Sequence, residues 1–178
     1  MVNRETPLIE RVPQRSKKGV YRIADGYVNF WFRFILPHRS LLESGNAALV
    51  YQQLITPHFS TYMGHVFEDV CRQYVLRYWD EKLKVAPKQV GAHWERDFDI
   101  DVLTENVDGS HFFGECKWWD APVGENVLDG LIQNTEKLPE RFRRNARYVL
   151  FSLGGFTDAL KRRAEREGVF LISADEMF

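Results

Sequence analysis

The sequence lacks any long apolar run. Its richest apolar stretch, from Tyr27 to Leu36, is short and is interrupted by Asn29 and Arg33, whereas a helix that crosses a bilayer needs about 20 apolar residues in succession. Residues 1–19 are polar and basic, without the apolar centre of a secretory signal. We therefore expect no membrane span and a cytoplasmic protein.

Cysteines and nucleotide-binding motifs are also scarce or absent. The two cysteines, Cys71 and Cys116, make no disulfide framework, and neither stands in a Cys-x-x-Cys metal spacing. The sequence contains no Gly-x-x-x-x-Gly-Lys-Ser/Thr phosphate loop and no Gly-x-Gly-x-x-Gly fingerprint. These absences exclude nucleotide hydrolases of those kinds and fit a protein of a reducing compartment.

Net charge is nearly absent, at −1, but the charges are unevenly distributed along the chain. Residues 1–40 carry a net charge of +5, residues 41–136 of −9 and residues 137–178 of +3. An acidic middle between basic flanks could bind a cation centrally and phosphates at its edges, or it could be an ordinary solvated surface. Composition alone favours the solvated surface.

The first part of the chain has the periodicity of helices. Residues 1–20 contain prolines and clustered basic residues and are expected to form a loop or mobile arm. Asp25 is expected to cap the first helix, Pro37 and Pro57 to end helices, and Ser60 or Thr61 to cap a helix with a continuous apolar stripe. The predicted helices cover residues 25–36, 40–43, 47–55 and 60–78.

The second part alternates between strand and helix patterns. Asp108-Gly109 lies between two predicted strands and is a strong hairpin signal. The element order from residue 60 is helix, three strands, helix, strand, helix, strand, which predicts an α/β fold with a mixed sheet flanked by helices. Strands are predicted at 90–96, 98–104, 111–118, 148–153 and 169–173, and helices at 123–138 and 157–167.

Alternation along the two hairpin strands brings charged side chains together. Asp101 is expected to face away from Ile100 and Val102, and Glu115 and Lys117 share one face of the next strand. Carboxylates that converge beside a lysine suit a divalent cation such as Mg²⁺, which prefers oxygen ligands. The alternative is a plain ion pair at a sheet edge, between Lys117 and either carboxylate.

Other charged residues extend this candidate site. Glu68, at the margin of the apolar stripe of the preceding helix, could reach it as a third acid. The basic cluster that contains Arg141, Arg143 and Arg144 favours contact with phosphates, although a solvated helix end would also explain it.

At two levels the sequence resembles known families. Asp101 and Glu115-Cys116-Lys117, after a helix with Glu68, resemble the PD-(D/E)XK nuclease superfamily, the fold of restriction endonucleases, over about residues 60–153. More narrowly, the chain resembles the C-terminal domain of unknown function of archaeal-type AAA ATPases. The segments that carry this second resemblance are Tyr21-Arg22-Ile23-Ala24-Asp25, Phe30-Trp31-Phe32-Arg33-Phe34, Gly64-His65-Val66-Phe67-Glu68 and Gly114-Glu115-Cys116-Lys117-Trp118.

The superfamily resemblance implies a Mg²⁺- or Mn²⁺-dependent nuclease that cleaves DNA. It makes Asp101, Glu115 and Glu68 the metal ligands and catalytic acids, and Lys117 the catalytic lysine. Ile100 stands where the superfamily pattern has a proline.

The ATPase resemblance implies how the chain is divided into domains and which partners it contacts. It divides the chain into a nuclease-like core, residues 60–178, and a basic arm with a helical extension, residues 1–59, a possible remnant of a winged helix. The extension would contact an ATPase domain or another protein. The alternative function is then a catalytically inactive module that binds DNA or protein and regulates an ATPase.

Overall fold

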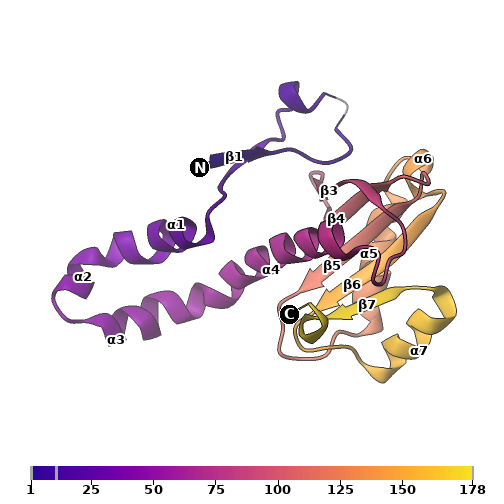
Figure 1. Cartoon of the computed structure of the whole chain (residues 1–178). Helices are drawn as coiled ribbons and strands as arrows, with labels where there is room; N and C mark the ends of the chain where they lie inside the picture. The colour runs from indigo at the N-terminus through magenta and orange to yellow at the C-terminus, as the bar shows by residue number, and fades with distance from the viewer. Residues whose placement is uncertain (1, 11, 178) are drawn as a thin grey trace.

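The computed structural model describes residues 2–10 and 12–177. Residues 1 and 11 of the predicted arm and residue 178 of the predicted core lie outside the described residues. Figure 1 shows an α/β body and a long helical hairpin that extends away from it. Within the described part of the chain, no helix combines the length and apolarity that crossing a membrane requires.

A five-stranded sheet forms the centre of the body. Along the sheet, the first two strand pairings are antiparallel and the next two are parallel, so the sheet is mixed, as predicted. In spatial order the strands are β3 (Pro87–Trp94), β4 (Asp99–Asn106), β5 (His111–Lys117), β6 (Ala146–Ser152) and β7 (Phe170–Ser173).

Helices cover both faces of this sheet, which confirms the predicted fold class. One face packs against α4 (Thr56–Tyr78), and the other against α5 (Glu125–Glu136) and α7 (Asp158–Glu167). Each interface is a separate apolar core. The α4 side buries Phe67, Cys71, Val102, Phe112 and Phe151, and the opposite side buries Ile100, Leu103, Phe113, Leu128 and Leu160.

Residues 2–5 form a strand, contrary to the predicted loop. β1 (Val2–Glu5) pairs antiparallel with β2 (Val20–Ile23). The segment between them is attached to the sheet edge by a hydrogen bond from Leu8 N to Ala92 O at 2.9 Å. These contacts join residues far apart in the sequence, so local patterns gave no sign of them.

The helical hairpin is more continuous than predicted. Asp25 caps α1 (Gly26–Phe30) as expected, since its side chain accepts a hydrogen bond from Val28 N at 2.9 Å. The chain then continues through a π-helix, a 3₁₀ turn and a short α-helix before it turns back. The remaining elements are the π-helix Trp31–Ile35, the 3₁₀ turn Leu36–His38, α2 (Arg39–Glu43), α3 (Ala47–Leu49) and the π-helix Val50–Ile55.

Neither Pro37 nor Pro57 ends the helical path, so that prediction was wrong. Both stand in the first turn of an element, where the N–H that proline lacks would have no helical partner. The wide π-turn before Pro57 lets Thr56 N bond to Tyr51 O. Consequently α4 begins at Thr56, and the two residues predicted to cap it, at positions 60 and 61, lie inside the helix.

α4 crosses the predicted boundary between residues 59 and 60. Its first half packs within the hairpin, where Phe34, Val50 and Ile55 surround Tyr62. Its second half packs on the sheet. The same helix therefore belongs to both parts of the molecule.

β4 contains an irregularity that the predicted alternation missed. Gly91 of β3 pairs with Leu103 of β4, but His93 pairs with Ile100. Three steps along β4 therefore oppose two steps along β3, so β4 has one extra residue there. Ile100 and Val102 consequently face opposite cores rather than the same one. Such a bulge bends a strand locally, and Asp101 lies within it.

Candidate active site

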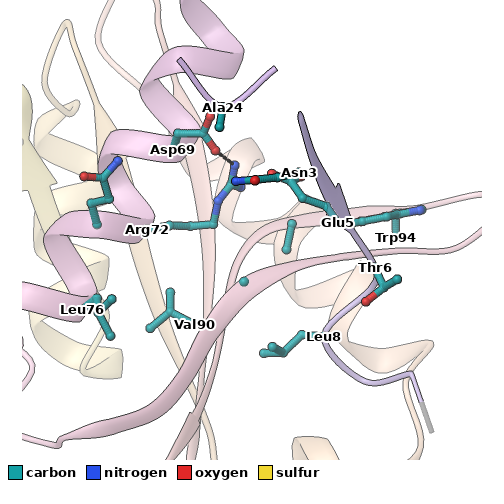
Figure 2. A pocket seen from close by; sticks show the side chains of 13 residues that line it. Asn3, Glu5, Thr6, Leu8, Ala24, Asp69, Arg72, Leu76, Val90 and Trp94 are labelled. Atoms are coloured by element: carbon teal, nitrogen blue, oxygen red, sulfur yellow. Dashed lines mark hydrogen bonds and ion pairs between the residues drawn. The ribbon is translucent and has the colours of Figure 1, made fainter. Parts of the chain in front are cut away.

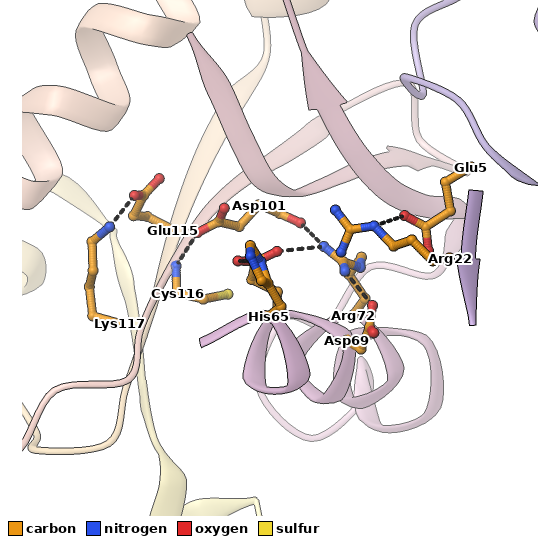
Figure 3. Close-up of polar contacts among 10 residues, drawn as sticks. Glu5, Arg22, His65, Asp69, Arg72, Asp101, Glu115, Cys116 and Lys117 are labelled. Carbon is orange, nitrogen blue, oxygen red and sulfur yellow. Dashed lines mark hydrogen bonds and ion pairs between the residues drawn. The ribbon is translucent and has the colours of Figure 1, made fainter. Parts of the chain in front are cut away.

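The candidate site lies where β4 and β5 meet beside α4 (Figure 3). The predicted Asp-Gly turn closes this hairpin: Gly109 has a φ of +78°, and the Asp108 carboxylate accepts a hydrogen bond from Ser110 N at 2.9 Å. The closed turn places the bulge of β4 next to the end of β5. Residues that are 14 positions apart in the sequence thereby become neighbours.

Asp101 is held between the two strands and α4. Its Oδ2 accepts a hydrogen bond from Cys116 N at 2.9 Å, and its backbone carbonyl accepts one from Arg72 Nη1 at 2.7 Å. Burial raises the pKa of the Asp101 carboxyl to about 8, and the negative charges of Glu115 and Glu68 contribute to the increase. If Asp101 were ionised, its charge would add to those of Glu115 and Glu68 in a buried site. A proton or a cation at the site is therefore favoured.

Glu115 and Lys117 form an ion pair beside this carboxyl. Lys117 Nζ lies 2.5 Å from Glu115 Oε1, as expected for two side chains on one face of a strand. Burial raises the pKa of Glu115, although the ammonium of Lys117 opposes the effect. Burial lowers the pKa of Lys117, but the carboxylate of Glu115, together with Asp101 and Cys116, raises the pKa above its usual value, so the lysine stays charged.

Glu68 approaches the hairpin from α4. Its carboxylate lies 3.2 Å from His65 Nδ1 and 3.8 Å from Arg72 Nη1. Cys116 is buried on the α4 side of the sheet, and alternation turns Glu115 away from that side. Glu68 and Glu115 thus reach Asp101 from different directions.

The carboxylate oxygens of Asp101 and Glu115 are the kind of ligand that a hard divalent cation prefers. Within residues 2–10 and 12–177, no three His, Cys, Asp or Glu side chains are gathered as a ready metal site. Mg²⁺, however, commonly uses only one or two protein carboxylates together with water and substrate phosphates. Asp101 and Glu115 supply two carboxylates, and a cation beside them would offset the burial and the neighbouring negative charges that raise both pKa values.

The arginines predicted to contact phosphates lie elsewhere. Arg141 and Arg143 are in α6 (Glu140–Arg143), which precedes β6, and Arg144 follows directly. The start of β6 is paired with the start of β5, about six residues or 20 Å from the Lys117 end. The structure therefore does not bring this cluster to the carboxylates.

Sequence reasoning missed Arg72, which links α4 to the site. Besides the Asp101 carbonyl, its guanidinium contacts the carboxylate of Asp69. The available signal was helical spacing, since Arg72 stands three residues after Asp69 and four after Glu68.

One hollow adjoins the site without containing Asp101, Glu115 or Glu68. It has a volume of about 440 Å³ and lies between β1, α4 and β3. Figure 2 shows Arg72 and Asp69 on its α4 wall, with Asn3 and Trp94 on the opposite side. A smaller hollow of about 270 Å³ contains Glu68 and Lys117.

Comparisons with known proteins give a family and distant likenesses. Residues 31–137 match the DUF234 family, described as "Archaea bacterial proteins of unknown function". An uncharacterized protein of Methanocaldococcus jannaschii is 34% identical over 121 residues, 67% of this chain and 26% of that protein. The chain thus spans about a quarter of that relative's length, and the predicted association with an ATPase stays a prediction.

Two solved structures are similar at lower levels. A repair endonuclease from Pyrococcus abyssi is 18% identical, over 57% of this chain and 45% of that chain, with a TM-score of 0.40. A complex of EndoMS with dsDNA is 19% identical, over 60% of this chain and 43% of that chain, with a TM-score of 0.44.

Proposed function

We propose that this chain, which belongs to the DUF234 family, cleaves phosphodiester bonds in DNA and needs a divalent metal ion to do so. The proposal is based on the geometry of its candidate site. The observation that carries the proposal is the meeting of Asp101, Glu115 and Lys117 from two adjacent strands. A carboxyl with a strongly raised pKa beside a charged lysine is typical of functional sites.

Each residue has a distinct role in this proposal. Asp101 and Glu115 hold Mg²⁺ or Mn²⁺, and Glu68 adds negative charge from α4. Such a cation, when bound, polarises a phosphodiester and lowers the pKa of a bound water. Lys117 stabilises the negative charge that develops on the phosphate. Arg72 positions Asp101 through its backbone carbonyl.

Substitution of the site residues tests the proposal. We expect Asp101→Asn, Glu115→Gln and Lys117→Met each to reduce cleavage of single- and double-stranded DNA about 100-fold or more. Glu68→Gln is expected to have a smaller effect, because Glu68 approaches from the other side. Gel assays with Mg²⁺ or Mn²⁺ measure the rates, and circular dichroism checks folding.

A matched control is Lys161→Met, which removes an exposed lysine of α7 whose nearest carboxylate is 3.8 Å away. Its cleavage rate should equal that of the unchanged chain. Activity that survives both Asp101→Asn and Lys117→Met would exclude this site as the catalytic centre.

A second candidate function is a non-catalytic module that binds DNA or protein. The observation that favours it is the closed Glu115–Lys117 ion pair. A Mg²⁺ titration of the melting temperature separates the two functions. A bound cation raises the melting temperature by mass action, whereas an ion pair that stays closed gives no response.

A further inference from the structure

Three neighbouring hollows along α4, which we call the path, share lining residues. The hollow with Glu68 and Lys117 shares Ser60 and Trp118 with a neighbour of about 250 Å³. It shares His65 with another hollow of about 410 Å³ on the other side. Glu68 and Lys117 therefore line the middle one of the three hollows, whereas Asp101 and Glu115 line none of them.

One end of the path has exposed aromatic rings. Trp119, Phe59 and Tyr51 border it and are 47%, 41% and 64% exposed. Lys117 Nζ lies 5.3 Å from the centre of the Trp119 ring. A planar group stacked on Trp119 would therefore sit beside the lysine of the candidate site.

The other end has cationic side chains. Arg22 and Arg33 border the hollow of about 410 Å³, which Glu5 and Asp69 also line. Within residues 2–10 and 12–177, no carboxylate lies within 4.0 Å of the Arg33 guanidinium, which rests over aromatic rings instead. Arg22 pairs with Glu5 at 3.2 Å, a partly exposed contact that a phosphate could replace.

We propose that this path binds one unpaired strand of DNA, with phosphates at the arginine end and bases stacked on Trp119 and Phe59. The inference rests on the proposed function for its catalytic centre and adds the substrate class. Bases in a duplex stack on one another, whereas unpaired bases expose their faces to protein rings. Aromatic rings on one side of the hollow that holds Lys117 and Glu68, and arginines on the other side, match a single strand that passes beside Lys117.

Binding without divalent metal tests this proposal separately from cleavage. Fluorescence anisotropy in EDTA compares a labelled oligothymidylate of about 12 nucleotides with a duplex of equal length. We expect the single strand to bind at least about fivefold more tightly. Trp119→Ala and Phe59→Ala should each weaken its binding about 5- to 10-fold, and Arg33→Met should weaken it and reduce its dependence on salt.

Tyr78→Ala is the matched control. Tyr78 is also an exposed aromatic residue of α4, about 27 Å from Ser60 along the helix axis, and its removal should leave binding unchanged. Equal affinity for duplex, or Trp119→Ala and Phe59→Ala variants that bind like Tyr78→Ala, would overturn the proposal.

The result for cleavage is independent. A chain that prefers single strands through Trp119 but does not cleave them with Mg²⁺ supports this inference and contradicts the proposed function. A chain that cleaves DNA but binds duplex equally well contradicts this inference alone.

Discussion

At the scale of single residues, the proton on Asp101 controls the charge of the candidate site. With a pKa of about 8, this carboxyl is mostly protonated at neutral pH, where an ordinary aspartate is ionised. Its ionisation places a charge near Glu115 and Glu68. Cation binding and loss of this proton are therefore expected to occur together.

The raised pKa of Asp101 should make the stability of the metal-free chain depend on pH. A carboxyl whose folded pKa lies above its unfolded value stabilises the folded state below the unfolded pKa, and this contribution is lost as the pH rises through the folded pKa. The melting temperature of the metal-free chain should therefore fall between about pH 4 and about pH 8 relative to Asp101→Asn. Differential scanning fluorimetry measures both, and Asp120→Asn is an exposed control. Parallel curves for the chain and Asp101→Asn would contradict the raised pKa.

The raised pKa of Asp101 should also make the stabilising effect of Mg²⁺ depend on pH. Because Mg²⁺ competes with the proton on Asp101, its stabilising effect should increase as the pH rises from about 6 to about 8. Asp101→Asn should lose most of this response. A shift that is the same at both pH values would show that the cation binds away from Asp101.

At the scale of elements, close packing of β4, β5 and β6 sets the distance between Asp101 and Glu115. Gly114, in the middle of β5, has no room for a side chain: a Cβ there would lie 2.9 Å from Val102 Cβ and 3.0 Å from Val149 Cγ1. A larger residue must push a neighbouring strand away. Gly114 therefore supports the site through the strand spacing.

We expect Gly114→Ala to lower the free energy of unfolding by about 1–3 kcal/mol, as overpacking in a core does. It should also weaken the thermal response to Mg²⁺, because β4 carries Asp101. Gly130→Ala is the control: a Cβ there meets nothing within 4 Å, and in the middle of α5 alanine should stabilise by about 0.5–1 kcal/mol. Urea unfolding measures both, and a neutral Gly114→Ala would contradict this account.

At the scale of the whole molecule, the helical hairpin and the sheet have separate cores, and α4 contributes residues to both (Figure 1). Phe34 is 2% exposed and packs against Phe30 and Tyr62, all within the hairpin. The hairpin can therefore open without loss of the sheet.

Phe34→Ala should increase hydrogen exchange of amides in residues 26–55 while β5 and β6 keep their protection. Loss of a buried phenylalanine costs about 3–5 kcal/mol. Phe32→Ala, at a position 53% exposed in the same hairpin, should change exchange little. Equal loss of protection in hairpin and sheet would show that the molecule unfolds as one unit.

Local patterns in the sequence determined much of the fold and part of the site. The Asp25 cap, the Asp108-Gly109 turn and the α4 stripe depend on neighbours within a few residues, so they can be read directly. The shared face of Glu115 and Lys117 follows from strand alternation alone.

Only the tertiary structure decided how these pieces meet. The bulge at Asp101 depends on pairing with β3, and the partners of Arg72 and Glu68 depend on how α4 lies on the sheet. The β1–β2 pair and the position of α6, far from Lys117, likewise depend on contacts between distant segments. Such contacts leave no periodic signal in the sequence, because their geometry is set by packing of whole elements rather than by adjacent residues.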